Sequence, residues 1–139
     1  MIVLDTNVLS ELIRRAPASS LQDWMLAQPA SSLFTTTVTQ AEMLLGVALL
    51  PRGKRRAGLT EAVAGLFEID FAGRVLPFDG AAARAFALVA AERRQAGRPI
   101  SQLDAQIAAV ARSRDAAIAT RNTSDFQGCG IEVVNPWQP

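Results

Sequence analysis

The sequence predicts a single α/β domain over residues 1–139, built on a central, mostly parallel sheet of four to five short strands flanked by helices. Its 139 residues are 50% apolar, which suits one domain with its own core. Short apolar runs alternate with longer segments whose apolar residues recur at helical spacing. No repeat or linker interrupts this alternation, which favours a parallel sheet covered by helices on both faces.

In the first half of the chain, each expected element follows from a local pattern. Short β-rich runs predict strands, and apolar residues three or four positions apart predict helices. Ser19 and Ser20, after Pro17, are expected to cap the second helix. These patterns give a strand at residues 2–4, a helix through Val8 to Ile13, a helix from Ser19 towards Pro29, a strand at 33–36, a helix from Thr37 towards Pro51 and a helix at 54–67.

The second half repeats the same signals. Asp79-Gly80 closes a strand, and Gly97-Arg98-Pro99 ends a long Ala-rich helix. Ser101 then precedes a further helix as its expected cap. The elements are a strand at 75–78, a helix at 81–96, a helix from 102 to about 114, and strands at 116–120 and 132–134.

The residue types that are missing exclude whole classes of chemistry. The chain has no histidine and one cysteine, Cys129. It therefore cannot form a Ser-His-Asp or Cys-His pair or a Cys/His zinc cage, so carboxylates must carry any chemistry. Because no apolar run approaches a membrane span, and Asp5 stands where a signal peptide needs basic residues, we expect a cytoplasmic protein with no membrane partner.

Four carboxylates lie where strand-to-helix loops begin. Asp5 ends the first strand, and Glu42 lies near the start of the helix after residues 33–36. Asp104 opens another helix, and Asp125 follows the strand at 116–120. Such loops open at one edge of a parallel sheet, where the repulsion between converging acids would require a cation. Oxygen ligands without histidine or cysteine favour Mg²⁺ or Mn²⁺, as in phosphoryl-transfer sites.

Each of these acids also has a purely structural interpretation. Asp5 is a suitable helix cap, and Asp125 is a common turn residue. Thr39 with Glu42 and Ser101 with Asp104 both match the spacing of a capping box. The local patterns leave both interpretations open.

Four ordered motifs extend over essentially the whole chain. They are Ile2-Val-Leu-Asp5-Thr-Asn7-Val-Leu, Thr39-Gln-Ala-Glu42, Gly97-Arg-Pro-Ile-Ser-Gln-Leu-Asp104-Ala-Gln-Ile-Ala-Ala and Ala119-Thr-Arg-Asn122-Thr-Ser-Asp125-Phe. With this order and spacing, the sequence resembles PIN-domain ribonucleases, in particular VapC-type toxins of the FitB-like branch. The resemblance implies a single PIN-like domain and the toxin of a type II toxin–antitoxin pair.

The resemblance also implies a mechanism and partners. Asp5, Glu42 and Asp104 would hold Mg²⁺ or Mn²⁺, and a bound water would attack an RNA phosphodiester. Asp125 is expected as the fourth acid and metal ligand, although some relatives carry that acid at the position of Asn122. The implied partners are RNA, a VapB- or FitA-like DNA-binding antitoxin and a second copy of the chain.

Polar residues near the acids have expected supporting roles. By the same resemblance, Asn7, Thr120 and Asn122 would orient the carboxylates or the attacking water. Arg52, Lys54, Arg55 and Arg56 form the only dense basic run, which predicts either contacts to an RNA backbone or a solvated face.

Two other functions remain open at this stage. Asp5-x-Asn7 could be a nucleophile motif that forms an aspartyl-phosphate, as in haloacid-dehalogenase-like phosphatases. That motif normally has a second acid where Asn7 stands, and the only lysine, Lys54, lies within the basic run. Alternatively, the chain is a non-catalytic protein-binding module with capped helices and an inert cleft.

Overall fold

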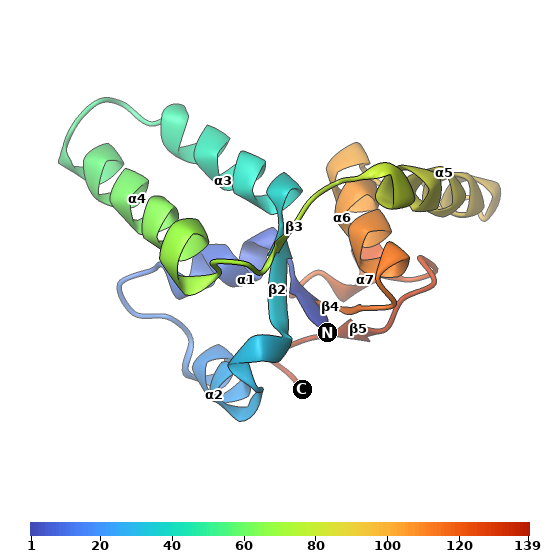
Figure 1. Ribbon diagram of the computed structural model, residues 1–139, viewed down its shortest axis with the longest axis horizontal. Helices are drawn as coiled ribbons and strands as arrows, with labels where there is room; N and C mark the ends of the chain where they lie inside the picture. The colour runs from blue at the N-terminus through green and yellow to red at the C-terminus, as the bar shows by residue number, and fades with distance from the viewer.

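The computed structural model describes residues 1–139 and confirms the α/β class (Figure 1). Five strands form one parallel sheet in the order β3-β2-β1-β4-β5. None of the helices combines the length and the hydrophobicity that crossing a membrane requires. The strands are β1 (Ile2–Leu4), β2 (Leu33–Thr36), β3 (Val75–Leu76), β4 (Ala117–Ala119) and β5 (Val133–Val134).

Seven α-helices flank the sheet, with a 3₁₀ turn, η1, before β2 and a π-helical turn, η2, after α4. The helices that follow β1, β2 and β3 start directly or within a few residues of the strand ends, as the alternating pattern predicts. Their bounds are α1 (Thr6–Leu12), α2 (Ser19–Ala27), η1 (Ala30–Ser32), α3 (Thr37–Ala48), α4 (Lys54–Gly65), η2 (Leu66–Asp70), α5 (Gly80–Gln95), α6 (Gln102–Ser113) and α7 (Thr123–Phe126).

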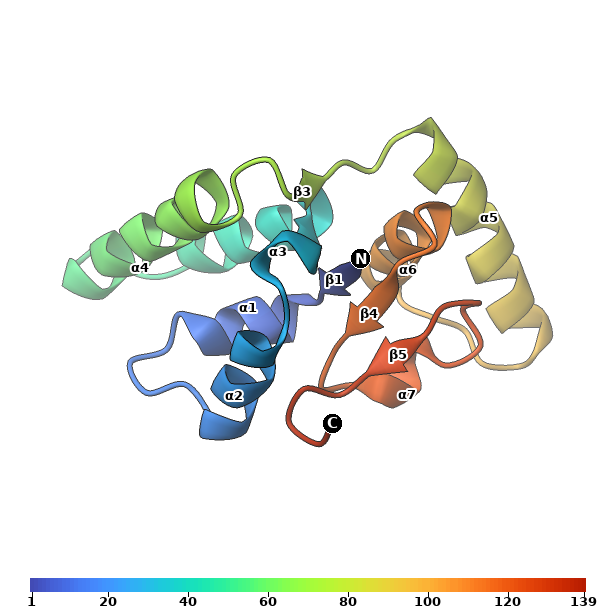
Figure 2. The same cartoon turned by 60° about the horizontal axis from the view of Figure 1, so that its bottom comes forward.

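The order of the strands creates a point where the chain changes direction across the sheet. From central β1 the chain builds outward through β2 to β3, then returns to the other side of β1 for β4 and β5 (Figure 2). β1 pairs with both β2 and β4, and Val3 lies opposite Phe34 and Ile118. Open α/β sheets bind ligands at the carboxyl ends of the strands at such a switch point.

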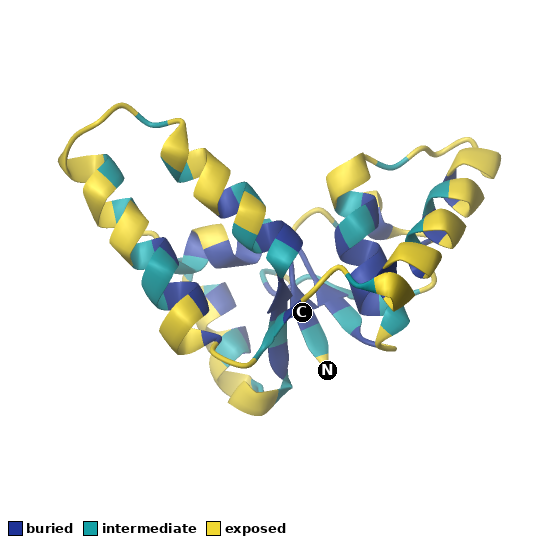
Figure 3. Cartoon of the chain, turned by 45° about the horizontal axis from the view of Figure 1, so that its top comes forward, coloured by how far each residue is buried: buried dark blue, intermediate teal, exposed yellow.

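Alternating side chains of the strands divide the core between the two faces of the sheet. Val3 and Ile118 pack in a cluster with α5 and α6, whereas Leu4 and Ala119 pack in a second cluster with α1, α2 and α4. Figure 3 shows two helical arms that rise from the sheet, one of α3 and α4 and one of α5 and α6. Buried residues gather where the arms meet the sheet, and the outer ends are exposed.

The predicted cap of the second helix was wrong. Ala18, not Ser19 or Ser20, is the N-cap residue of α2, and it makes no side-chain capping bond. The Ala18 amide instead donates to the Glu11 carboxylate at 3.1 Å. This tertiary bond fixes the start of the helix one residue earlier than the serines suggest.

Other element boundaries also differ from the prediction. The helix expected at 54–67 ends at Gly65 and continues as η2, where the Phe71 amide donates to the Leu66 carbonyl at 2.9 Å. The wide turn buries Leu66, Phe67 and Phe71 together. β3 ends at Leu76 rather than residue 78, since Pro77 has no amide hydrogen to continue the ladder. β4 and β5 are shorter than the ranges 116–120 and 132–134, and the short α7 was not predicted.

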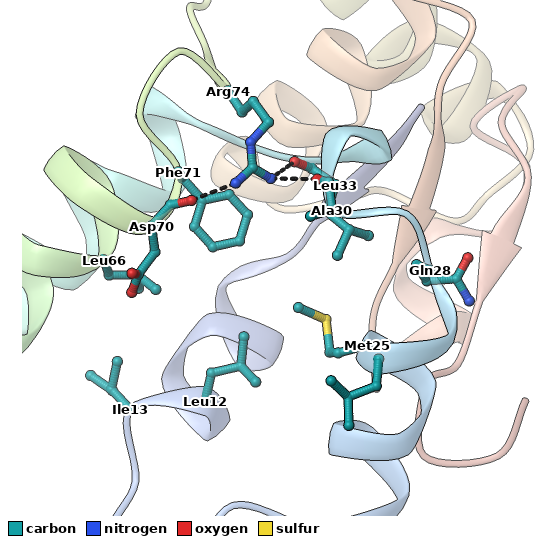
Figure 4. A pocket seen from close by; sticks show the side chains of 11 residues that line it. Leu12, Ile13, Met25, Gln28, Ala30, Leu33, Leu66, Asp70, Phe71 and Arg74 are labelled. Atoms are coloured by element: carbon teal, nitrogen blue, oxygen red, sulfur yellow. Dashed lines mark hydrogen bonds between the residues drawn. The ribbon is translucent and has the colours of Figure 1, made fainter.

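Arg74 joins the end of η2 to the start of β2 (Figure 4). Its Nη1 donates to the carbonyls of Ala30 at 2.7 Å and Leu33 at 2.6 Å, and its Nη2 donates to the Asp70 carbonyl. The guanidinium also stacks over the Phe71 ring, 4.9 Å from its centroid. One side chain therefore ties together three segments at the amino-terminal edge of β3.

Candidate functional site

A polar cleft of about 340 Å³ opens at the switch point, beyond the carboxyl ends of β1, β2 and β4. Its lining has three carboxylates, no hydrophobic side chain and no cationic one. Acids that share a cleft without a counter-ion create a strongly negative potential. The lining residues are Asp5, Thr6, Asn7, Ser10, Glu42, Asp104 and Asn122.

Asp5 is the buried centre of the site, with 4% of its surface exposed. Its Oδ1 accepts from the Thr6 amide at 2.8 Å, so Asp5 caps α1 as predicted. Its Oδ2 accepts from the Thr120 hydroxyl at 2.8 Å and the Asn7 amide group at 3.2 Å. Burial raises the pKa of Asp5 to about 6; the Thr120 and Thr6 bonds oppose this, and the nearby Asp104 and Glu42 charges add to it.

Thr120 connects the two strands on which the site is built. Its buried hydroxyl donates to Asp5 and accepts from the Asn7 side chain at 3.2 Å and the Asn122 amide at 3.1 Å. The Asn7 Oδ1 in turn accepts from the Arg121 amide at 3.1 Å. The network fixes the loop after β4 against the start of α1 and leaves the Asp5 carboxylate one orientation.

Glu42 enters the cleft from the second turn of α3. The predicted capping box of Thr39 and Glu42 was wrong, because Thr36 caps α3 by accepting from the Thr39 amide at 3.0 Å. The Glu42 Oε1 instead accepts from the Thr6 hydroxyl at 3.0 Å, and Thr6 also contacts the Thr39 hydroxyl at 3.1 Å. Burial raises the pKa of Glu42, the Thr6 bond opposes the rise, and the Asp104 charge adds to it.

Asp104 enters from the opposite arm, in the first turn of α6. Ser101 caps this helix by accepting from the Asp104 amide at 3.2 Å, as predicted. Burial raises the pKa of Asp104 and the Asp125 charge adds to the rise, whereas Ser101 and the positive charge of Arg93 lower it. The charges of one neighbouring acid and one buried cation therefore act on the pKa of Asp104 in opposite directions.

The two candidates for the fourth metal ligand, Asn122 and Asp125, lie in different places. Asn122 lines the cleft, whereas Asp125 is exposed on α7 and does not line it. Asp125 still lies close enough to influence Asp104 through its charge. Of the seven predicted site residues, five line the cleft, Thr120 lies beneath it and Asp125 lies beside it.

The donor set fits a hydrated divalent cation better than a tightly enclosed one. No three acidic or cysteine side chains are close enough to surround one ion directly. Mg²⁺ usually keeps several waters and takes only one or two carboxylates directly. The charges of Glu42 and Asp104 add to the raised pKa of Asp5, and the charge of Asp104 adds to that of Glu42, so these carboxylates would gain from a cation bound among them. The residues present therefore fit Mg²⁺ or Mn²⁺.

Sequence reasoning missed two hydroxyl side chains of the site. Thr6 holds Glu42 in place, and Ser10 lines the cleft one turn further along α1. Ser10 lies three residues after Asn7 and therefore on the same face of α1. That spacing could have identified Ser10, whereas no local spacing points to Thr6, whose bond to Glu42 joins distant segments.

Two further hollows have a different chemistry. An apolar groove of about 470 Å³ lies between α1, α2 and η2, and Leu12, Ile13, Met25 and Phe71 are among its lining residues (Figure 4). A hollow of about 390 Å³ beside the turn between α3 and α4 is lined by Arg52, Arg56 and Thr60 with small neighbours. Neither hollow contains a cluster of acids.

Comparisons with known proteins identify the family. The model of the PIN domain family matches residues 2–128. The plasmid stability protein StbB of Pseudomonas syringae is 43% identical over 99% of both chains. The VapC ribonuclease Y4jK of Sinorhizobium fredii is 41% identical over the whole of this chain and 99% of its own.

Solved structures of toxin–antitoxin proteins also match this chain. The structure of FitAB bound to an IR36 DNA fragment matches with a TM-score of 0.92 and 37% identity, covering 100% of this chain and 97% of that one. The VapBC-5 toxin–antitoxin complex of Mycobacterium tuberculosis matches with a TM-score of 0.73 and 28% identity over 96% of each chain.

The raised pKa of Asp5 predicts how the stability of the metal-free protein changes with pH. A carboxyl group with a pKa of 3.8 in the unfolded chain and about 6 in the folded one binds its proton more tightly when folded. The Asp5 contribution to stability therefore falls as pH rises from about 4 to 6, by a total of the order of 3 kcal/mol, and stays low above that range.

The measurement is urea unfolding of wild type and Asp5→Asn in chelator between pH 4 and 8. The variant is expected to gain stability relative to wild type as pH rises to 7, because it has no carboxylate to desolvate. Asp23→Asn, which changes an exposed acid on α2, is the matched control. A stability difference between Asp5→Asn and wild type that does not change with pH would contradict the argument.

Proposed function

The chain belongs to the PIN-domain family and is a homologue of VapC and FitB toxins, and we propose that it is a divalent-metal-dependent endoribonuclease acting as the toxin of a toxin–antitoxin pair. One observation carries the proposal: Asp5, Glu42 and Asp104, from three separate elements, line one polar cleft that has no basic side chain, and burial there raises the pKa of all three. No local structural role requires that convergence. Asp5 caps α1 and Asp104 lies in the first turn of α6, but the Glu42 carboxylate caps nothing, and neither local role brings the three acids together.

Asp5, Glu42 and Asp104 would hold Mg²⁺ or Mn²⁺. When bound, the cation would neutralise developing charge on the phosphoryl group and lower the pKa of the attacking water. The family resemblance supports a divalent metal, and the oxygen-only donor set favours Mg²⁺ or Mn²⁺ over zinc.

The chain's own side chains orient the reacting groups and accept the proton. Thr120 and Thr6 fix the carboxylates of Asp5 and Glu42 before substrate arrives. No histidine is available as a base, so a carboxylate of the cleft is the natural acceptor of the proton released when water attacks phosphorus. Asn122 contributes an uncharged amide to the lining, and Asp125 extends the negative charge beside Asp104 as the fourth acid.

The basic run is the best candidate for contact with the RNA backbone. Arg52, Lys54 and Arg55 are exposed, Arg56 is half-buried, and none of the four forms an ion pair. They lie at the outer end of the arm whose other end carries Glu42 (Figure 1). Glu42 lies six residues before Ala48, the last residue of α3, which is about 9 Å along the helix axis. The basic run therefore lies a few nucleotides' length from the cleft.

The two other functions fit the geometry less well. Both Asp5 carboxylate oxygens accept hydrogen bonds and the side chain is buried, so it is poorly placed to attack a phosphate. No lysine lines the cleft to grip that phosphate. An inert binding module would not explain why Glu42 and Asp104 come together from opposite arms.

An antitoxin could contact both the acidic cleft and the apolar groove by lying along α1. Thr6, Asn7 and Ser10 of this helix line the cleft, and Leu12 and Ile13 line the groove. Seven helical residues span about 10 Å, which about three extended residues can cover. We therefore propose that a C-terminal segment of the antitoxin docks along the helix that begins at residue 6, with apolar anchors in the groove between α1, α2 and η2. Its basic side chain would point towards Asp5, beside the helix of residues 38–50 that carries Glu42.

A second copy of the chain is the other proposed partner. The inner face of α5 is buried through Ala82, Ala85 and Val89. Its outer face exposes small alanines and Leu88, which is 53% exposed. Small side chains permit close approach of a second helix, so this face is the proposed site of a homodimer.

The nuclease activity should depend on the cleft and on a divalent metal. Asp5→Asn, Glu42→Gln and Asp104→Asn are each expected to lower kcat on structured RNA roughly 100-fold or more, because each removes a charge that would hold the cation. Asp125→Asn should have a smaller effect, and Asp23→Asn should have none. Chelator should abolish cleavage and Mg²⁺ or Mn²⁺ should restore it. Cleavage that survives EDTA, or a phosphate trapped on Asp5, would overturn the proposal.

The contribution of the basic run can be read from salt dependence. For single-stranded RNA, the slope of log affinity against log salt changes by about 0.7 for each phosphate that the protein no longer neutralises. The double variant Arg52→Ala/Arg56→Ala should therefore lower the slope by about 1.4. Arg15→Ala/Arg84→Ala, which removes the same charge from exposed sites elsewhere, should leave it nearly unchanged. Equal slopes for the two variants would identify the run as a solvated face.

The docking proposal separates inhibition from binding. Replacing the cleft-facing arginine of the antitoxin by alanine should restore nuclease activity while a complex remains detectable, because the apolar anchors stay in place. Conversely, Leu26→Asp, at an 85% exposed position on the groove, should weaken the complex while leaving activity intact. Full inhibition by the arginine-free antitoxin would show that steric cover alone blocks the cleft.

A further inference from the structure

Arg93, on α5, is the only buried basic residue of the chain, with 6% of its surface exposed. It forms no ion pair with any carboxylate. Burying an unpaired charge costs free energy unless its donors are well hydrogen-bonded, so the contacts that Arg93 makes in this position must compensate for that cost.

The oxygen atoms that accept hydrogen bonds from Arg93 are all main-chain carbonyls of two loops. Its Nε donates to the Arg98 carbonyl at 2.7 Å, in the loop between α5 and α6. Its Nη1 donates to the carbonyls of Asp125 at 2.7 Å and Gln127 at 2.8 Å, and contacts the buried Cys129 sulfur at 3.6 Å. The two loops thus share one guanidinium.

Those two loops carry different parts of the acidic cleft. The loop at Arg98 leads into the Ser101 cap and Asp104, whereas the turn at 122–127 carries Asn122 and Asp125. The other hydrogen bond between them is a long, exposed one of 3.5 Å from Arg98 Nη2 to the Ser124 carbonyl. Arg93 is therefore the main hydrogen-bonded connection between the two segments.

The position of Arg93 also suits the electrostatics of the cleft. It is not among the lining residues, yet its charge is close enough to act on Asp104. A cation on the protein side of the cleft offsets repulsion between acids without filling the space that a ligand needs.

We propose that Arg93 is a positioning residue of the site, which fixes the turn carrying Asn122 and Asp125 against the start of α6 and thereby sets the spacing between these side chains and Asp104. The catalytic consequence rests on the proposed function, whereas the fixing of the turn does not.

The chain offers a matched control in Arg74. It also donates to three main-chain carbonyls, but it lines the apolar groove (Figure 4) and is not among the residues that line the cleft. Arg93→Met and Arg74→Met each remove the donors and keep an aliphatic stem. Arg93→Lys retains the charge without the planar fork, and is the variant to use should Arg93→Met fail to fold.

Three measurements test the inference. In metal-free protein, Arg93→Met should speed amide hydrogen exchange at residues 122–128 about tenfold or more, since a shared anchor is removed. It should also weaken Mn²⁺ binding in calorimetry and lower kcat by about tenfold, with KM little changed. Arg93→Lys should fall between it and wild type. Arg74→Met should change exchange near Asp70 and Leu33 but leave the other two quantities unchanged.

Each outcome decides a separate point. Unchanged amide exchange at residues 122–128 in Arg93→Met would refute the anchoring role. If Arg93→Met does not fold and Arg93→Lys replaces it, wild-type exchange, Mn²⁺ affinity and kcat in Arg93→Lys would refute it equally. If Arg93→Met shows faster amide exchange but has the same Mn²⁺ affinity and kcat as Arg74→Met, then Arg93 has only a structural role and the proposal is overturned. Wild-type protein that neither binds Mn²⁺ nor cleaves RNA would refute the proposed function, with the exchange data still deciding the anchor.

Discussion

The site depends on a carboxyl group buried at the end of the central strand. The main chain of Asp5 cannot move, because its amide donates to the Ala119 carbonyl of β4 and its own carbonyl accepts from the amides of Val8 and Leu9. Its side chain is equally constrained by Thr6, Asn7 and Thr120. Burial nevertheless raises the pKa of Asp5, because these bonds replace only part of the hydration that the carboxylate would have in water. The fold therefore holds a carboxylate that a cation would stabilise further.

Much of the fold and part of the site could be predicted because they follow from local patterns and one topological rule. The strands at 2–4 and 33–36 matched the structure, since β-rich runs there end directly at polar residues that begin helices. Asp5, Glu42 and Asp104 follow or lie near strand ends, and the shared edge of a parallel sheet brings such residues together. Ser101 was recognised as a cap because its bond to Asp104 lies within three residues.

What could not be predicted depends on contacts between distant segments. Thr36 caps α3 although Thr39 also fits the local pattern, because Thr39 is buried and contacts Thr6 instead. The Glu11 bond to Ala18 likewise overrides the serines of α2. Asn122 and Asp125 stand three residues apart around a four-residue helix, so which one faces the cleft depends on how the loop is held. Arg93 holds that loop from 32 positions away, and its sequence neighbourhood of alanine and arginine contains no sign of it.

The same repulsion that favours a metal also explains how such a site could be controlled. An arginine from an inhibitor and a divalent cation would satisfy the same unneutralised charge, so under the proposed function each would weaken the binding of the other. A basic side chain alone would be a poor inhibitor, because any rise in metal concentration would displace it. An inhibitor that stays bound when metal is present must take its affinity from contacts other than those with the carboxylates of the cleft. The apolar groove is suited to this role, since Leu12 and Ile13 stand on the same short helix as Thr6 and Asn7. The polar start of α1 would thus take the inhibitor's basic side chain, which blocks the acids, whereas its apolar end would take the contacts that supply the inhibitor's affinity.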